Sequence, residues 1–273
     1  MKTFKERITL IKNHRGCYVL DTVKGCSVLA SKPRGCYDDC YANKIVSRYV
    51  QIDFTKPIKR KFEYDSSGQL YFQGFYDTKH ENEIIRQIKN MDMSFVRIGE
   101  MGDPSEDWEH TINICKIISI AKKTIVLITK HLKMISDSQL EQISKMNICI
   151  NTSISALDNW DELDKRLRMY HELKKACKSA LRIVSCDFNK ENSEGKARAK
   201  IQEELFKNDN VIDTVFRPSK NNPLVVNGII KTEKIRFLKQ DVLASLYNKK
   251  AYLGYCNNCP DMCGAAGTTG GTR

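Results

Sequence analysis

Short apolar runs alternate along the chain with longer segments in which apolar residues recur at helical spacing. Runs rich in Ile, Val and Leu occupy residues 17–23, 95–101, 124–130, 147–155, 180–188 and 211–219. The segments between the later runs place apolar residues three or four positions apart and predict amphipathic helices at 107–121, 136–145, 161–177 and 194–207. The pattern therefore predicts six strand–helix units in series.

Strands that are apolar along their whole length, with helices between them, are typical of a parallel sheet covered by helices. A helical crossover after every strand gives either a doubly wound sheet or a barrel. In both arrangements the functional loops gather at the carboxyl ends of the strands. The expected fold class is thus α/β, with its functional residues at one edge of the sheet.

Polar residues stand where several of these strands are expected to end. They include Gly99-Glu100, Thr129-Lys130-His131, Ser153 and Ser155, Arg182, and Arg217-Pro218-Ser219-Lys220. Each alone would be ordinary in a helix cap or a turn. Because parallel strands end at a shared edge, together they predict a polar rim around a pocket.

The charge of the chain is strongly positive. Forty-five Lys and Arg residues against 33 Asp and Glu give a net charge of +12, which favours a polyanionic partner, most obviously nucleic acid. A basic surface without a partner is the competing interpretation. Residues 51–90 interrupt the regular rhythm and are interpreted as a basic and aromatic insertion. Its basic run 56–62 and its aromatic residues could follow a phosphate backbone and stack on bases, or form a hairpin packed on the core.

Neither a membrane span nor a secretory signal is expected. No apolar run approaches the roughly 20 residues that a spanning helix requires, and residues 1–16 contain basic residues without an apolar stretch ending in a cleavage site. The expected location is cytoplasmic, a reducing compartment in which the 11 cysteines would more often bind metal than form disulfides.

One group of cysteines lies in a turn-rich loop directly after the first predicted strand. The stretch 25–43, GCSVLASKPRGCYDDCYAN, contains Cys26, Cys36 and Cys40 among Gly and Pro. Soft thiolates bind zinc and iron–sulfur iron well, and such a loop can wrap its sulfurs around one centre. By contrast, Cys115, Cys149, Cys177 and Cys186 stand singly in apolar segments and are expected to be small buried side chains.

A second group, Cys256, Cys259 and Cys263, lies near the end of the chain with Cys-x2-Cys-x3-Cys spacing. This is a metal-binding pattern with three local ligands. A zinc ion would need a fourth ligand, from Cys17 or a distant His, whereas a second iron–sulfur cluster could use the three thiols alone. Two further alternatives remain: the tail folds back to share the metal of the first loop, or its cysteines bind nothing.

The cysteine loop after the first strand, the Gly99-Glu100 pair ending the second and the six strand–helix units resemble the radical S-adenosylmethionine (SAM) superfamily. The resemblance covers roughly residues 17–220. The order GC, GC and CYA is similar to a branch associated with phages and bacteria whose reactions are mostly unknown. Asn43 stands where the third cysteine of the familiar Cys-x3-Cys-x2-Cys motif would be, so the resemblance requires Cys26 as the third ligand.

The resemblance implies a partial TIM-type (β/α)6 barrel of parallel strands over residues 1–220 and a cysteine-rich C-terminal extension over 221–273. It also implies a [4Fe–4S] cluster held by three thiolates, with SAM on the open iron. Glu100 would accept the methionine ammonium group, Gly99 would allow close backbone approach, and Ser153, Ser155 and Arg182 would serve the carboxylate and ribose. An electron donor such as flavodoxin or ferredoxin would reduce the cluster.

Two other interpretations compete with a radical SAM enzyme. The first is a non-enzymatic zinc protein that binds nucleic acid, with both cysteine groups structural. The second is a barrel of this kind that has lost its cluster. Its support is Asn43, which stands where the familiar motif has its third cysteine. Six strand ends with polar residues favour the enzyme, because a structural zinc module does not require a pocket.

Overall fold

The structure is a computed structural model that describes residues 5–31, 40–50, 52–63, 79–215, 223–225, 251–252 and 254–265. Several sequence predictions lie outside these ranges: Cys36, the aromatic residues of the insertion from Tyr64 to Tyr76, and Arg217-Pro218-Ser219-Lys220.

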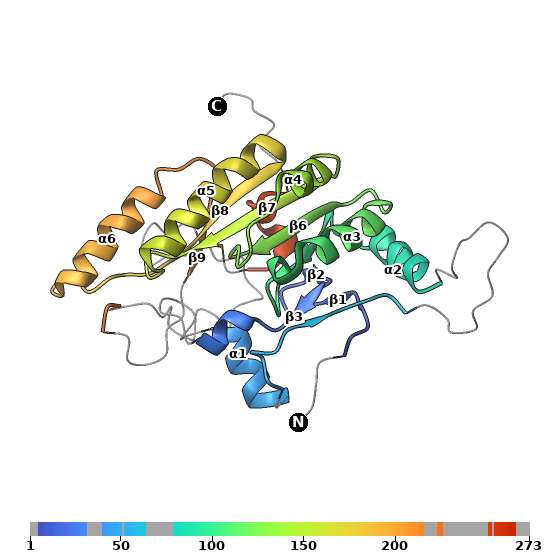
Figure 1. The fold of residues 1–273 in the computed structure, drawn as a ribbon, viewed down its shortest axis with the longest axis horizontal. Coiled ribbons are helices and arrows are strands. Elements are labelled where there is room, and N and C mark those ends of the chain that lie inside the picture. Colours follow the sequence, from blue (N-terminus) through green and yellow to red (C-terminus); the bar gives the residue numbers. More distant parts are fainter. Residues whose placement is uncertain are drawn as a thin grey trace.

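A seven-stranded sheet forms the centre of the described part of the chain, with the order β1-β2-β5-β6-β7-β8-β9 (Figure 1). The strands are β1 (Ile11–Lys12), β2 (Tyr18–Val19), β5 (Phe95–Ile98), β6 (Thr124–Thr129), β7 (Ile148–Ile154), β8 (Lys178–Ser185) and β9 (Val211–Val215). Strand β1 is antiparallel to β2, and every other neighbouring pair is parallel. The α/β class with parallel strands is therefore confirmed.

The parallel strands lie side by side in the order in which they occur in the chain. A doubly wound sheet reverses its strand order at a switch point, and the described strands show no such reversal. The outer strands β1 and β9 do not pair with each other in the described residues, so no barrel closure is seen.

Helices cover one face of this sheet, which we call the helix face (Figure 1). They are α2 (Lys79–Asn90), α3 (Trp108–Ser119), α4 (Asp137–Ser144), α5 (Trp160–Ala176) and α6 (Ser193–Leu205). Helix α2 lies within the segment interpreted as an insertion, yet its Ile84 and Ile88 pack into the main core with Ile98 of β5. It is the crossover between β2 and β5. None of the described helices is both long and apolar enough to cross a membrane.

Alternation along the strands sends every second residue to the opposite face of the sheet. Ile148 and Ile150 of β7 pack against the helices, whereas Cys149 between them packs with Cys256 and Ala265 of the C-terminal segment. That segment contains two short 3-10 turns, η4 (Cys256–Asn258) and η5 (Met262–Gly264). The C-terminal tail thus covers the opposite face, as Figure 1 shows behind the strands.

The cysteine loop belongs to a small appendage of the sheet. Strands β3 (Val23–Lys24) and β4 (Ile58–Lys59) form an antiparallel pair, and between them lie η1 (Ser27–Ser31), α1 (Tyr41–Ile45) and the π-helical turn η2 (Val46–Val50). Gly25 has a φ of +97°, and an added Cβ there would lie 2.8 Å from Pro57 Cα. Only glycine suits this sharp entry into the loop.

Candidate functional site

The structure brings Cys26 and Cys40 together in one apolar cluster. Cys26 packs with Ala42, Val46 and Phe54, and Cys40 lies against the same group. Partly buried neighbours of this cluster include Met101 and Leu132, which follow β5 and β6. The two thiols therefore lie at the carboxyl end of the sheet, while Cys36 lies outside the described residues.

The surroundings of Cys26 favour its neutral thiol. Burial, followed by the negative charges of Asp103 and Glu106, raises its pKa to about 12. Glu106 is held beside the loop because it accepts hydrogen bonds from Ser27 N at 2.5 Å and from Ser27 Oγ at 2.9 Å. A bound metal cation would reverse this preference, since metal binding replaces the thiol proton.

Glu100 precedes Met101, which packs against the loop cluster and accepts a hydrogen bond from Gly25 N, but the Glu100 carboxylate has its partners on the opposite face. Asn13 Nδ2 donates to both carboxylate oxygens, at 2.9 and 3.1 Å, and the Arg97 guanidinium forms an ion pair with Glu100. The preceding Gly99 has a φ of +95°, and an added Cβ would meet Ile128 O at 2.3 Å. Any ammonium group that binds Glu100 must therefore share its carboxylate with Asn13 and Arg97.

Asp21 holds the turn that carries Glu100, and the sequence analysis did not single it out. Its carboxylate accepts hydrogen bonds from the backbone N–H groups of Gly99, Glu100 and Met101, at 3.1, 2.8 and 3.2 Å. Burial raises the pKa of Asp21 above its ordinary range, and these hydrogen bonds oppose that rise. The available signal was a carboxylate inside the apolar run 17–23.

Ser153 and Arg182 lie on the opposite face and are direct neighbours in the β7–β8 register. Arg182 Nε and Nη2 donate to Asn151 Oδ1 at 3.2 and 3.0 Å, and Nη1 donates to Thr214 Oγ1 at 3.0 Å. The guanidinium is therefore held in place between β7 and β9. Thr214 is a member of this group that the sequence analysis missed, because it stands inside a strand rather than at a strand end.

Ser155 is separated from this group by its hydrogen bonds. Its Oγ donates to Val184 O at 3.2 Å and accepts from Leu157 N at 3.2 Å, and the residue is fully buried. The hydroxyl stabilises the turn that follows β7. Both serines predicted to serve a ligand are buried, but Ser153 retains 8% exposure on the opposite face, whereas Ser155 is fully buried in the turn.

Part of the predicted polar rim is buried between the sheet and the helices. Asp103 accepts hydrogen bonds from Thr129 Oγ1 and Lys130 N, both at 2.7 Å. His131 Nε2 is 2.9 Å from Thr152 Oγ1, and burial lowers the pKa of this imidazole to about 4. These groups hold the loops after β5 and β6 on the side that faces the helices, and they do not line a cleft.

The cysteines of the C-terminal tail form a second group, at the other end of the strands. Cys256 is buried with Cys17 at the start of β2 and Cys149 near the start of β7. Arg15 clamps the tail, since its Nε donates to Gly254 O at 2.9 Å and its carbonyl accepts from Cys256 N at 2.8 Å. This group and the loop cysteines belong to separate clusters. The tail therefore does not share the site of the first loop among the described residues.

Cys17 and Cys256 are in thiol–thiol contact. That contact is the largest cause that lowers the pKa of Cys256 to about 6, and the positive charges of Arg15 and Arg97 act in the same direction. The same contact raises the pKa of Cys17 well above its ordinary value. The neighbouring thiol and the arginines thus favour the thiolate of Cys256, while burial and the charge of Glu100 oppose it.

The described residues contain no group of three or more His, Cys, Asp or Glu side chains arranged to hold a metal ion. The loop contributes two neighbouring thiols, Cys26 and Cys40, and the tail contributes the pair of Cys17 and Cys256. Both pairs offer soft donors of the kind that iron–sulfur clusters and zinc require. Thiol chemistry in both places therefore fits a metal, with further ligands needed in each.

The basic run at residues 56–62 is largely neutralised by carboxylates. Its lysines pair as Lys56–Asp53 at 3.5 Å, Lys59–Asp107 at 2.5 Å and Lys61–Glu6 at 2.8 Å. Arg60 is different, because its side chain turns inward and is only 4% exposed. The exposed part of the run is thus less cationic than its sequence suggests.

Comparison of the chain with protein-family models, with curated proteins and with solved structures found no match.

Proposed function

We propose that the protein is a radical SAM iron–sulfur enzyme. The observation that carries the proposal is the meeting of Cys26 and Cys40 at the carboxyl end of a parallel sheet, beside the turn that presents Glu100. Soft thiols lie beside the turn that carries a held carboxylate, and a held guanidinium lies on the opposite face of the same sheet. These residue types are suited to a metal cluster and a charged cofactor.

The strand order supports a partial (β/α)6 barrel as the framework of this site. Six parallel strands in chain order have their connecting helices on one face, and a ligand would lie on the opposite face, part of which the C-terminal segment 254–265 covers. In barrels of this kind, the functional residues stand at the carboxyl ends of the strands. Glu100, Ser153 and Arg182 come from three different strands or strand ends and share that face.

Each residue has a distinct role in this proposal. Cys26, Cys36 and Cys40 hold a [4Fe–4S] cluster, which with SAM supplies a 5′-deoxyadenosyl radical for hydrogen abstraction when reduced by a donor such as flavodoxin or ferredoxin. Glu100 orients the ammonium group of SAM, and Asp21 positions Glu100 through three backbone hydrogen bonds. Ser153 and Arg182 bind the carboxylate or ribose. The substrate is nucleic acid or derived from a nucleotide.

The tail cysteines are proposed to hold a second metal, either zinc or another iron–sulfur cluster. The contact between Cys17 and Cys256 supports Cys17 as the ligand added to Cys256, Cys259 and Cys263. The lowered pKa of Cys256 favours its thiolate, the form that binds a cation, whereas Cys17 and Cys259, whose pKa values are raised, would lose protons on binding. Its place at the amino ends of the strands indicates a structural role.

Metal analysis of protein purified and reconstituted without oxygen tests the proposal. About four irons with matching sulfide, or about eight if the tail holds a second cluster, are expected. Addition of SAM and a reductant should then release 5′-deoxyadenosine. Zinc alone, in a colourless protein that releases none, would instead favour the non-enzymatic nucleic-acid-binding protein.

A further inference from the structure

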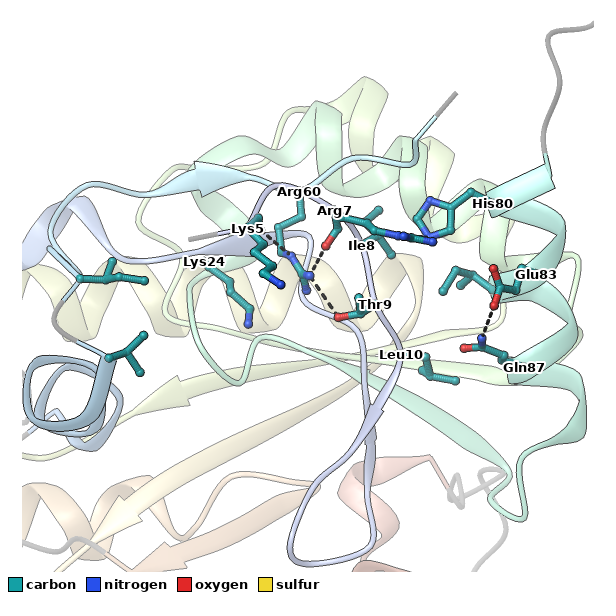
Figure 2. Close-up of a pocket in the computed structure, with 13 residues that line it drawn as sticks. Lys5, Arg7, Ile8, Thr9, Leu10, Lys24, Arg60, His80, Glu83 and Gln87 are labelled. Carbon is teal, nitrogen blue, oxygen red and sulfur yellow. Dashed lines mark hydrogen bonds between the residues drawn. The ribbon is translucent and has the colours of Figure 1, made fainter. Parts of the chain in front are cut away.

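A pocket of about 760 Å³ lies on the N-terminal side of the cysteine loop, between the first residues of the chain, the β3–β4 pair and helix α2 (Figure 2). Its lining includes Lys5, Arg7, Lys24, Arg60 and His80. This volume is within the range of small-molecule sites. The pocket lies apart from Ser153 and Arg182, which are not among its lining residues.

The charge of the lining is one-sided. Four cationic side chains, those of Lys5, Arg7, Lys24 and Arg60, face the pocket together with one carboxylate, Glu83. Glu83 accepts a hydrogen bond from Gln87 Nε2 at 3.1 Å and lies on α2, away from Lys24 and Arg60 in Figure 2. A concave basic surface concentrates anions, because its walls focus the electrostatic field.

Arg60 is buried in the wall of this pocket among neutral partners. Its Nε donates to Lys5 O at 3.3 Å, and its Nη2 donates to Arg7 O and to Thr9 Oγ1. The residue is only 4% exposed, and burial lowers its pKa while the negative charge of Asp21 opposes that effect. A buried cation whose hydrogen-bond acceptors are neutral keeps part of its desolvation cost, which an anion in the pocket would offset.

Arg7 and His80 show a conflict between hydrogen-bond donors at the other end of the pocket. Glu63 N lies 2.9 Å from His80 Nδ1, and Arg7 Nε lies 3.3 Å from His80 Nε2. A neutral imidazole accepts a hydrogen bond at only one ring nitrogen. The two donors therefore compete for one acceptor nitrogen, and whichever ring nitrogen carries the hydrogen faces another donor. Arg7 Nη1 also pairs with Glu63 at 3.2 Å, with both side chains about half exposed. An acceptor atom placed between Arg7 Nε and His80 would satisfy the competing donors.

We infer that this pocket binds the phosphate group of a nucleotide or of a nucleic-acid strand, with Arg7 and His80 on one side and Lys24 and Arg60 on the other. Phosphate oxygens accept several charge-assisted hydrogen bonds, which matches a lining of cations and N–H donors. The inference goes beyond the proposed enzymatic function and does not depend on the cluster, since neither Cys26 nor Cys40, the loop cysteines that the structure describes, lines the pocket.

Calorimetric titration with a 12-nucleotide single strand, ATP and pyrophosphate at low salt tests the inference. We expect binding that weakens as salt rises, because neutralised phosphates release counterions. Arg7→Gln and Lys24→Gln should each weaken it by about tenfold or more, the value of a hydrogen bond to a charged group. If the strand binds more tightly than ATP, the phosphate that the pocket recognises belongs to a nucleic acid. If ATP binds equally or more tightly, that phosphate belongs to a nucleotide.

Lys59→Gln and Lys61→Gln are matched controls, because they remove the same charge from the same basic run but outside the pocket lining. They should change affinity less than about twofold, as exposed ion pairs contribute little. Arg60 is left intact, since its bonds hold the backbone of residues 5–7. Absence of binding to all three probes, or equal losses in pocket and control variants, would overturn the inference. Iron content and SAM cleavage of the same variants test the enzyme proposal separately.

Discussion

The two cysteine groups lie at opposite ends of the same strands and have opposite electrostatic surroundings. At the carboxyl end, burial and the carboxylates Asp103 and Glu106 hold Cys26 in its neutral form, with a pKa of about 12. At the amino end, the Cys17 thiol and the arginines Arg15 and Arg97 lower the pKa of Cys256 to about 6, against burial and the charge of Glu100, which raise it. The first site favours a neutral thiol, whereas the second favours a thiolate at Cys256.

This difference indicates that the two cysteine groups have different roles. A site rich in carboxylates suits an added metal centre with a large positive charge, because that charge alone makes thiolates stable there. A site with built-in arginine suits a group that stays folded whether or not a metal is present. We therefore expect reactivity at the carboxyl end and structural support at the amino end.

The largest expected effect separates the two cysteine groups. Cys26→Ala and Cys40→Ala should each reduce SAM cleavage to the background level and remove the iron of the loop site, because a lost thiolate leaves the cluster with too few ligands. Cys259→Ala should retain that iron. Iron assays and 5′-deoxyadenosine release measure both effects. Cys186→Ala, at a buried cysteine outside both groups, is the control, and wild-type iron content in Cys26→Ala would contradict the assignment.

The next prediction tests the buried Arg166, which supports the carboxyl end of β6. Arg166 is fully buried, donates to Asp158 Oδ2 at 2.6 Å and to Lys130 O at 2.7 Å, and so braces the end of β6. Arg166→Ala should lower the free energy of unfolding by about 3–5 kcal/mol, because it leaves a buried carboxylate with fewer partners. Urea denaturation measures the loss.

Arg168→Ala is the matched control on the same helix. Arg168 pairs with Asp164 at 2.8 Å, but both side chains are exposed, so its removal should change the free energy of unfolding by less than about 1 kcal/mol. Equal losses in the two variants would refute the role of Arg166.

A somewhat smaller effect is expected from pH. Burial lowers the pKa of His131 from 6.5 to about 4, so the folded state favours the neutral imidazole. The stability contribution is therefore fully present above pH 6.5 and is lost as the pH falls towards 4, by about 3 kcal/mol in total. His131→Asn should remove this part of the pH dependence of unfolding.

Asn suits the backbone at this position, where φ is +51°. The exposed His171 on α5 provides a control for the His-to-Asn change itself, and the acid slopes of His131→Asn and His171→Asn are compared. A profile that keeps its acid slope in His131→Asn would assign that slope to other groups.

The smallest effect distinguishes two neighbouring serines. Ser153→Ala should raise the dissociation constant for SAM by up to about tenfold, the value of one hydrogen bond. Ser155→Ala should leave SAM affinity unchanged but lower the free energy of unfolding by about 1 kcal/mol, because its hydroxyl bonds Val184 O and Leu157 N. Titration with SAM and thermal unfolding would separate the two. If Ser155→Ala weakened SAM binding while Ser153→Ala lowered only the stability, the roles assigned to the two serines would be exchanged.

The strands and helices from residue 95 onward could be predicted because their apolar periodicity extends over many residues. The predicted helix 136–145, for example, is α4 at Asp137–Ser144, preceded by a capping box between Ser136 and Gln139. Strand β1 could not be predicted, because Ile11–Lys12 is a two-residue exposed edge with no pattern of its own. Its pairing depends on the neighbouring strand rather than on local preference.

The candidate site was predictable in residue type but not in arrangement. The sequence pointed to Glu100 at a strand end, but not to its ion pair with Arg97 or its bonds from Asn13, a residue 87 positions away. Similarly, Ser155 and His131 have the polarity of rim residues, yet tertiary packing turns them into the fold. Such contacts depend on which faces meet, and periodicity does not encode that.

The hydrogen bonds by which Arg15 holds the C-terminal segment have a consequence for the order in which the chain folds during synthesis. Its bonds to Tyr252 O and Gly254 O join residues that are 237 and 239 positions apart, so they form only after residue 254 has left the ribosome. Until then, the tail cannot cover the opposite face of the sheet, although the strands that form this face are already synthesised. The order of translation therefore makes the covering of that face a late step of folding.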